Sequence, residues 1–123
     1  MSRRYIAKDP TLPFADAVLI DEKTLYISGR IGLIPGTRQV PDDIGEEAAN
    51  LMKDLQGVLA AAGMSLEDLV TLTVYCPDVS LWEPFNAIYR TFFTGSLPPR
   101  AFIGSGPLLF GARFELQGIA VKS

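Results

Sequence analysis

Apolar residues recur along the chain at two spacings, one typical of helices and one of strands. Between residues 44 and 62 an apolar side chain returns every three or four positions, as on one face of an amphipathic helix. The members of this stripe are Ile44, Ala48, Leu51, Leu55, Val58, Leu59 and Ala62. Asp42 or Asp43 can cap the start of the helix, and Gly63 can end it.

A second helix is predicted to start at Ser80. Ser80 and Glu83 form the S-x-x-E pattern of a capping box, which satisfies two backbone N–H groups at a helix start. The apolar stripe of this helix is strongly aromatic and consists of Trp82, Phe85, Ile88, Tyr89, Phe92 and Phe93. We interpret it as core packing rather than as a platform for a cofactor or a base.

Strands are predicted where short apolar or β-branched runs lie between turn residues. These runs are Ala17–Ile20, Leu25–Ser28, Leu69–Cys76, Ala101–Ser105 and Arg113–Val121. A short strand around Arg38–Val40 is an alternative to a plain loop, and residues 1–13 are expected to be irregular. The order of elements predicts an α+β sandwich in one domain, residues 1–123, with a mixed sheet of five or six strands and two helices on one face.

The last predicted strand and the central one, Leu69–Cys76, also indicate what lies on the second face of the sheet. In the last strand Phe114, Leu116 and Ala120 share one face, and Glu115, Gln117, Ile119 and Val121 share the other. In the central strand Val70, Leu72, Val74 and Cys76 oppose Leu69, Thr71, Thr73 and Tyr75. The second face is too apolar to be freely solvated, so we expect another subunit to cover it.

The composition of the chain argues against several classes of protein. Hydrophobic residues make up 48% of the chain, the mean hydropathy is +0.22, the net charge is −3 and the pI is near 4.8. An acidic chain lacks the basic footprint of a nucleic-acid-binding protein. The single cysteine, Cys76, excludes an intrachain disulfide and is read as a small buried residue in a reducing compartment. With no signal peptide or membrane span predicted, the expected location is the cytoplasm.

The chain has no histidine, which excludes serine–histidine and cysteine–histidine catalysis and removes the usual nitrogen ligand of zinc. The glycines of GSGPLLFG do not form a dinucleotide fingerprint, because a proline interrupts them and no helix follows. A guanidinium, a carboxylate, backbone groups and water remain for any chemistry. Arg100 and Glu115 are the two candidates.

Arg100 follows two prolines that restrict the backbone before it, so its planar fork can be presented to a small carboxylate. The alternative is a salt bridge at the surface or at an interface. Glu115 lies among apolar residues, where an acid is costly unless it is paired, and it could serve as a general acid or base. The alternative is a structural pair with Arg113, Arg30 or Arg100.

Four segments of the sequence are specific enough to compare with known families: LYISGRIGL, VLAAAGMSLEDLV, VYCPDVSLWEPFNAIYRTFF, and PPRAFIGSGPL followed by ARFELQGIAV. In order and spacing they resemble the RidA (YjgF) family of enamine and imine deaminases. The resemblance runs from Pro13 to Val121 and implies a chorismate-mutase-like fold and a homotrimer with ligand sites between subunits. It implies hydrolysis of reactive 2-enamine and 2-imino acids to a 2-oxo acid and ammonia, with no cofactor and no metal.

The resemblance also implies roles for particular residues. Arg100 would bind the substrate carboxylate and Glu115 would hold the attacking water. The remaining substrate-binding positions would be Phe14, Ser28, Gly29, Arg30, Ala101 and Phe102, and Asn86 would be structural. Phe14 stands where many members have a tyrosine, and Arg30 stands where a glutamine is frequent.

These two departures bear on the substrate. A cation at Arg30 could accept a more acidic ligand, or could neutralise Glu115 or Asp16. Two other functions remain open: a non-catalytic trimer that binds small carboxylates in the same clefts, and a ribonuclease. The acidic pI and the absence of histidine argue against the ribonuclease.

Overall fold

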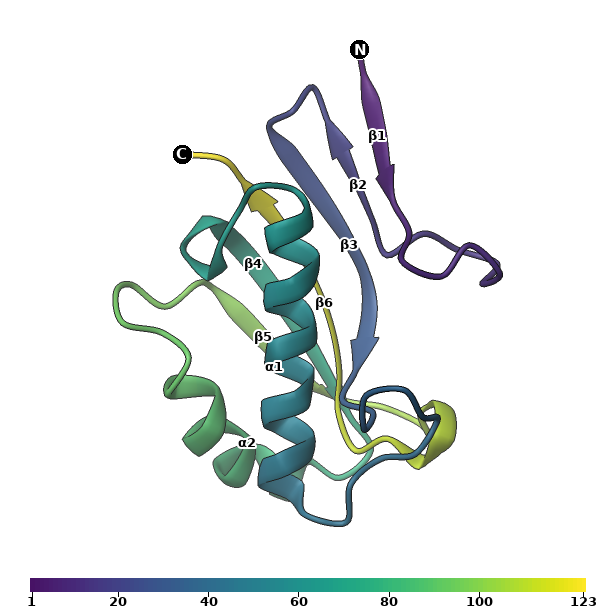
Figure 1. The fold of residues 1–123 in the computed structure, drawn as a ribbon. Helices are drawn as coiled ribbons and strands as arrows, with labels where there is room; N and C mark the ends of the chain where they lie inside the picture. Colours follow the sequence, from purple (N-terminus) through teal and green to yellow (C-terminus); the bar gives the residue numbers. More distant parts are fainter.

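A single six-stranded sheet carries two helices on one of its faces (Figure 1). The computed structural model describes residues 1–123. The strands are β1 (Arg3–Ile6), β2 (Ala17–Ile20), β3 (Thr24–Ile31), β4 (Leu69–Cys76), β5 (Arg100–Gly104) and β6 (Glu115–Val121), and the helices are α1 (Ile44–Ala61) and α2 (Trp82–Arg90). The predicted α+β class is therefore confirmed.

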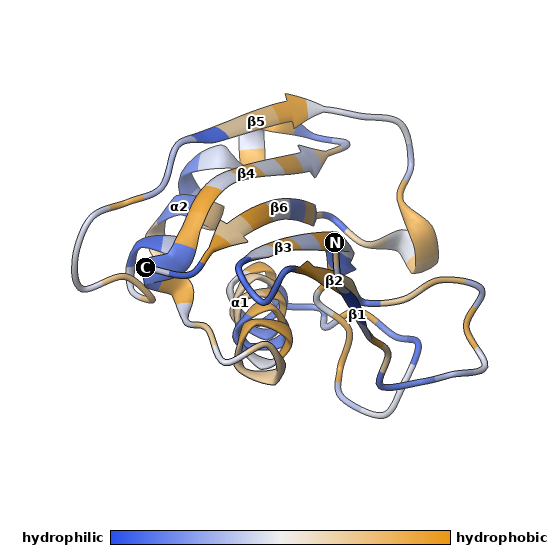
Figure 2. Cartoon of the chain, turned by 90° about the horizontal axis from the view of Figure 1, so that it is seen from above, coloured by the Kyte–Doolittle hydropathy of each residue, from blue (hydrophilic) through white to orange (hydrophobic).

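The strands lie in the order β1-β2-β3-β6-β4-β5. Neighbouring strands are antiparallel except β4 and β5, which are parallel and are joined by α2. The last strand in the sequence, β6, therefore lies inside the sheet between β3 and β4, whereas β5 forms an edge (Figure 2). This topology places Glu115 in the middle of the sheet and Arg100 at its margin.

The first helix begins and ends close to the predicted residues. The side chain of Asp43 accepts a hydrogen bond from the amide of Glu46 at 2.8 Å and caps α1. Gly63, just beyond the helix, has a φ of +72°, a conformation that glycine adopts without strain. The apolar stripe is buried against the sheet, with Leu51, Leu55 and Leu59 fully inaccessible. No helix in the structure combines the length and apolar character required to cross a membrane.

The second helix differs from its prediction at its start. The predicted capping box at Ser80 is wrong: a short 3₁₀ turn, Val79–Leu81, precedes α2, and the Asp78 carboxylate accepts from the amide of Ser80 at 3.0 Å. Trp82 then lies at the helix start and stays 48% exposed. The core interpretation holds for Phe85 and Tyr89, which are buried.

The strand predictions need corrections, beginning with β3, which continues past its predicted end at Ser28 to Ile31. Residues Arg3–Ile6, expected to be irregular, form β1 and pair with β2. The alternative strand at Arg38–Val40 does not form, and its residues belong to the loop between β3 and α1. Leu69 is buried and Val70 is 44% exposed, the reverse of the predicted faces. The cause is an irregularity in the β4–β6 pairing between Leu69 and Thr71, which shifts the alternation of side chains.

The face of the sheet opposite the helices is uncovered in the single chain. Tyr5, Tyr26, Val70 and Ile103 expose between 44% and 64% of their surface. In Figure 2 both helices lie on one side of the sheet, and no helix lies on the other side of β3, β6, β4 and β5. The predicted apolar second face is therefore present.

Candidate active site

Glu115 is the first residue of β6 and lies between Ile31 of β3 and Tyr75 of β4. The next residue, Leu116, is fully buried towards the helices, so Glu115 projects from the uncovered face. Glu115 forms no ion pair with Arg113, Arg30 or Arg100, so the structural pair considered from the sequence is wrong for the single chain.

Gly29 is in close contact with Glu115. A Cβ atom at Gly29 would lie 2.6 Å from Oε2 of Glu115, closer than real Cβ atoms approach. Ser28, just before it, donates from Oγ to the carbonyl of Ala15 at 2.6 Å. Phe14, which is 51% exposed, and Ser28 line a shallow hollow of about 270 Å³. Phe14 shares this hollow with Ser28, and the next residue, Gly29, lies against Glu115; we call these four residues the Glu115 half.

Arg100 starts β5 and lies beside Leu72 of β4, on the side of the sheet that the helices cover. Its Nη2 donates to Oδ1 of Asn86 at 2.6 Å. The guanidinium carbon lies 4.7 Å from the ring centroid of Tyr89, and the rings of Phe85 and Phe102 are within 5.6 Å. This group, the Arg100 half, surrounds a hollow of about 210 Å³ that Trp82, Leu97 and Pro98 also line.

The guanidinium of Arg100 is charged and is not neutralised by a carboxylate, so it can bind an anionic ligand. Burial lowers the pKa of Arg100, while the neighbouring Tyr89 opposes that shift, and an arginine remains protonated at neutral pH. Burial raises the pKa of Tyr89, whose hydroxyl is buried without a hydrogen-bond partner. No carboxylate pairs with Arg100. The alternative considered from the sequence, a salt bridge at the surface, is therefore not formed in the single chain.

The structure does not bring Arg100 and Glu115 together within one chain. The strand register aligns Arg100 with Leu72 and Gly118, and aligns Glu115 with Tyr75 and Ile103. These rows lie three residues apart along β4, so their side chains leave opposite faces of the sheet. Of the residues after the arginine, Ala101 is exposed, and the Phe102 ring packs 5.7 Å from that of Phe85.

Arg30 does not lie beside Glu115, contrary to one expectation from the sequence. Its guanidinium bonds Asp54 of α1 through Nε at 2.6 Å and Nη2 at 3.2 Å, and bonds Asp16 through Nη1 at 2.6 Å. The predicted neutralisation of Asp16 is confirmed, and that of Glu115 is wrong. A β-bulge in β3 between Ile27 and Arg30 explains this position, because it turns both side chains to the helical side.

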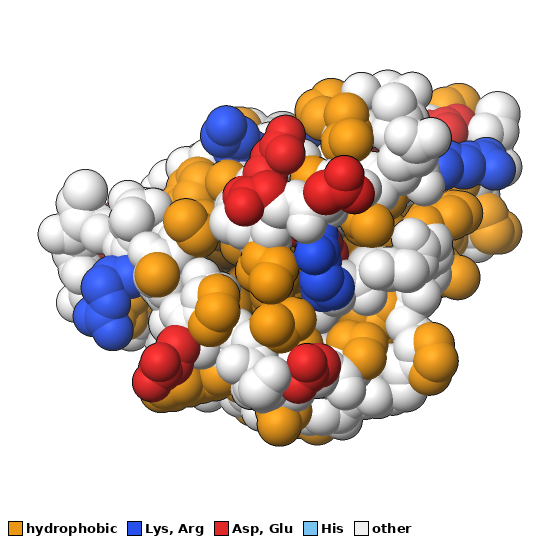
Figure 3. Space-filling model, turned by 90° about the horizontal axis from the view of Figure 1, so that it is seen from below, with side chains coloured by type: hydrophobic (Ala, Val, Ile, Leu, Met, Phe, Trp, Pro, Cys, Tyr) orange, Lys and Arg blue, Asp and Glu red, His pale blue; other side chains and the backbone are white.

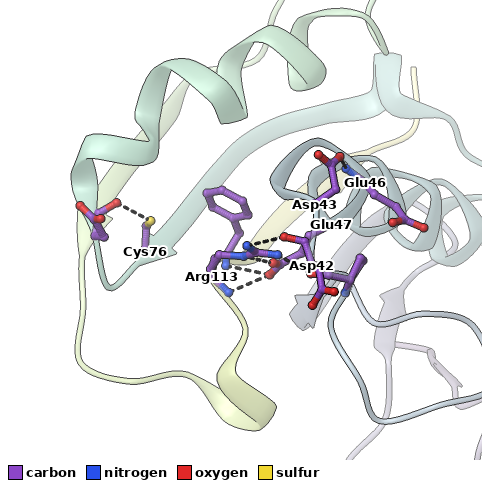
Figure 4. A network of polar contacts seen from close by, with 9 residues as sticks. Asp42, Asp43, Glu46, Glu47, Cys76 and Arg113 are labelled. Atoms are coloured by element: carbon purple, nitrogen blue, oxygen red, sulfur yellow. Dashed lines mark hydrogen bonds and ion pairs between the residues drawn. The ribbon is translucent and has the colours of Figure 1, made fainter.

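A second ionic network, which the sequence analysis missed, fixes the chain just before β6 (Figure 4). The fully buried carboxylate of Glu47 accepts from Nε of Arg113 at 2.6 Å and from the amides of Arg113 and Phe114 at 2.7 and 3.3 Å. Arg113 also donates to the carbonyls of Asp42 and Pro41. A signal was present: Glu47 lies beside Ala48 and four residues before Leu51, within the apolar stripe of α1.

Cys76 is a structural residue, as expected. It is buried, its thiol donates to the carbonyl of Asp78 at 3.0 Å, and burial raises its thiol pKa (Figure 4). No group of three or more acidic or cysteine side chains is arranged to hold a metal ion. The chemically available groups are therefore those of the two halves.

Known proteins resemble this chain in sequence and in structure. Residues 6–122 match the family described as Endoribonuclease L-PSP. The mouse 2-iminobutanoate/2-iminopropanoate deaminase is 41% identical over 111 residues, which cover 89% of this chain and 82% of the mouse protein. The chain therefore belongs to the RidA/YjgF/L-PSP family, as its sequence segments suggested.

Two solved bacterial structures share the fold at 26% sequence identity. The YjgF gene product of Escherichia coli has a TM-score of 0.89, over 98% of this chain and 99% of that one. The structure of E. coli TdcF with bound serine has a TM-score of 0.87, over 95% of this chain and 94% of that one. The fold of the whole chain is therefore that of this family.

Proposed function

We propose that this protein hydrolyses reactive 2-imino and 2-enamine acids to the 2-oxo acid and ammonia. The observation that carries the proposal is Arg100: a guanidinium held by Asn86 and three aromatic rings, with no carboxylate partner, beside a hollow of about 210 Å³. Such a fork suits a small carboxylate, the group that every 2-imino acid carries. The identity of 41% with the mouse deaminase supports the same substrate class.

We further propose that the site is completed between neighbouring copies of a homotrimer. Arg100 and Glu115 leave opposite faces of one sheet, so one chain cannot place both around a small substrate. The edge position of β5 and the uncovered apolar face favour a neighbouring copy that brings its Glu115 half to the Arg100 half. The resemblance to a trimeric family supports three copies.

In the proposed reaction Arg100 clamps the carboxylate and thereby orients the C=N carbon. Glu115 accepts a proton from a water molecule as the water oxygen bonds to that carbon. The C=N π electrons move to nitrogen, which takes up a proton from solvent. The resulting carbinolamine then collapses: its hydroxyl proton passes to solvent as the C=O bond forms, and its C–N bond breaks as Glu115 returns its proton to the leaving ammonia. Positioning supplies much of the acceleration, because such imines also hydrolyse in free solution.

The other predicted substrate-binding residues have supporting roles in this scheme. The backbone at Ser28–Gly29 and at Ala101–Phe102 offers hydrogen bonds to the substrate, and Phe14 forms an apolar wall in place of a hydroxyl. The reaction transfers protons and water but no electrons, so the scheme uses no cofactor. The single cysteine fits our expectation of a reducing cytoplasm.

Replacement of Arg100 tests the function. We expect Arg100→Ala to lower kcat/KM by about 100-fold, because the substrate loses its clamp. The measurement is 2-oxo acid release from a 2-imino acid freshly generated by an amino-acid oxidase. Arg4→Ala, which removes an exposed pair with Glu22, is the control. A wild-type protein without acceleration, or an unchanged Arg100→Ala variant, would overturn the proposal.

Mixing two inactive variants tests the shared site. If each site takes Arg100 from one copy and Glu115 from the next, co-expression of Arg100→Ala and Glu115→Gln should restore roughly a quarter of wild-type turnover. The reason is that random assembly brings two intact residues together in that share of the sites. A site contained within one chain would give no recovery.

The two alternative functions make different predictions. A non-catalytic carboxylate binder would retain ligand binding in both wild type and Glu115→Gln and would show no turnover. A ribonuclease would require an RNA-binding surface, but the chain carries a net charge of −3, and on the face in Figure 3 the basic side chains are scattered among acidic and apolar ones. Absence of RNA binding at low salt would exclude it.

A further inference from the structure

Arg30 joins three parts of the fold that lie far apart in sequence. Its side chain, only 11% exposed, forms charged hydrogen bonds to Asp54 on α1 and to Asp16 on the segment before β2. The Asp16 side chain is 9% exposed and that of Asp54 is 33% exposed. The guanidinium therefore bridges the helix, β3 and the segment that carries Phe14.

Asp16 is the point at which this bridge meets the Glu115 half. Its second carboxylate oxygen accepts from the amide of Lys8 at 2.9 Å, and its own amide donates to the carbonyl of Ile6 at 2.7 Å. Its carbonyl accepts from the amide of Ser28 at 2.9 Å, and the neighbouring carbonyl of Ala15 accepts from the hydroxyl of Ser28. The backbone of Ala15 and Asp16 thus holds Ser28, the residue just before Gly29.

The bulge of β3 makes this support necessary. Ser28 and Gly29 lie between the register positions of Ile27 and Arg30, where the regular pairing with β6 is interrupted. Backbone without regular ladder bonds depends on other partners to stay in place. Ser28 finds those partners in Ala15 and Asp16, and Gly29 lies against Oε2 of Glu115.

We infer that Arg30 is a positioning residue: by holding Asp16 against α1, it fixes Phe14 and the Ser28–Gly29 bulge in place beside Glu115. Its effect on turnover rests on the proposed function, whereas its effect on the bulge does not. Arg30 does not itself contact the substrate, because its three charged bonds direct it to the helical side of the sheet.

A planar fork is required for this role. Arg30 uses two nitrogens on Asp54 and a third on Asp16, a geometry that the single ammonium of lysine cannot reproduce and a glutamine matches only in part. Asp54 is held in place by α1, because the next residue of that helix, Leu55, is fully buried. Loss of the fork frees the 14–16 segment and leaves Asp16 and Asp54 without their shared cation.

The test uses the full chain and four variants: Arg30→Gln, Arg30→Lys, Asp54→Asn and the double variant Arg30→Gln/Asp54→Asn. Arg4→Gln is the matched control, because it breaks an arginine–carboxylate pair whose side chains are 48% and 57% exposed. Two quantities are measured: kcat and KM for the 2-imino acid, and amide hydrogen exchange at Ser28 with Thr73 of β4 as an internal reference.

We expect Arg30→Gln to lower kcat on the order of tenfold, with KM within about twofold, because Glu115 and its water lose their alignment while the Arg100 clamp is untouched. Exchange at Ser28 should accelerate by about tenfold and exchange at Thr73 should not change. Arg30→Lys and Asp54→Asn should shift both quantities in the same direction by less. The double variant should fall short of the product of the two single effects, since both residues belong to one bridge.

Two results would overturn the inference. One is wild-type kcat and wild-type exchange at Ser28 in Arg30→Gln. The other is a tenfold rise in KM at unchanged kcat, which would make Arg30 a direct substrate contact. If Arg30→Gln does not fold, Arg30→Lys and Asp54→Asn decide by the same criteria. If the wild-type protein has no turnover, the proposed function fails, and exchange at Ser28 alone decides the role of Arg30.

Discussion

The Glu115 half and the Arg100 half of the candidate site are built in different ways. The Glu115 half lies inside the sheet, where a bulge and a glycine bring backbone to within contact of a carboxylate. The Arg100 half lies on an edge strand, where the rings of Phe85, Tyr89 and Phe102 and one amide hold a guanidinium. In the proposed function, the central half would set the geometry of the reacting water and the edge half would bind the carboxylate.

The two halves also differ in what supports them. Two ionic networks brace the Glu115 half: Arg30 with Asp16 and Asp54 on one side, and Glu47 with Arg113 just before β6. The Arg100 half has no ion pair and depends on aromatic packing. Substitutions should therefore disturb the central half through loss of buried charge pairs and the edge half through loss of ring contacts.

The largest expected effect is that of Glu115→Gln. Because the amide cannot accept the proton of the attacking water, kcat should fall by about 100-fold or more, the range typical of a lost general base. Binding of a small unreactive carboxylate should remain, since the Arg100 half is intact. Steady-state kinetics and calorimetric titration measure the two quantities, and Glu22→Gln on the exposed surface is the control. A proportional loss of binding and turnover would contradict the division of roles.

The Glu47–Arg113 network that supports the central half should contribute to the free energy of unfolding. Glu47→Ala removes the only buried glutamate and leaves the amides of Arg113 and Phe114 without their acceptor. We expect the free energy of unfolding to fall by about 3–5 kcal/mol, the usual result of breaking a buried charge pair. Urea unfolding measures it. Glu46→Ala, the exposed neighbour in the same helical turn, should cost less than about 1 kcal/mol.

The smallest of these effects concerns the close approach at Gly29. A Cβ atom there would press on Oε2 of Glu115 at 2.6 Å, so Gly29→Ala should displace the carboxylate and lower kcat on the order of tenfold. Gly106→Ala is the matched control, because an added Cβ would meet nothing within 4 Å. Equal kinetics in the two variants would show that Glu115 tolerates a shift, and the central half would then not depend on precise backbone contact.

Sequence patterns predicted most of the framework and the two main candidate residues. The stripe from Ile44 to Ala62 indicated α1, and alternation around Glu115 assigned its face correctly. The pattern failed at Leu69 and Val70, where irregular pairing changes which side a residue faces, and it gave no sign of the bulge that turns Arg30 to the helical side. A β-bulge depends on the partner strand, so alternation along one strand does not reveal it. The predicted start of α2 was wrong for a different reason: the Asp78 carboxylate caps the preceding 3₁₀ turn, and Ser80 is not a capping residue.

The sequence by itself determined the α+β class, the two helices, the apolar second face and the absence of histidine chemistry, because these follow from local periodicity and composition. Only the tertiary structure decided which polar side chains meet. It placed Arg30 with Asp16 and Asp54, Arg113 with Glu47, and Arg100 with Asn86, and it left Glu115 unpaired beside Gly29. These partners lie between 14 and 66 residues apart in sequence, and the packing of the helices on the ordered sheet brings them together.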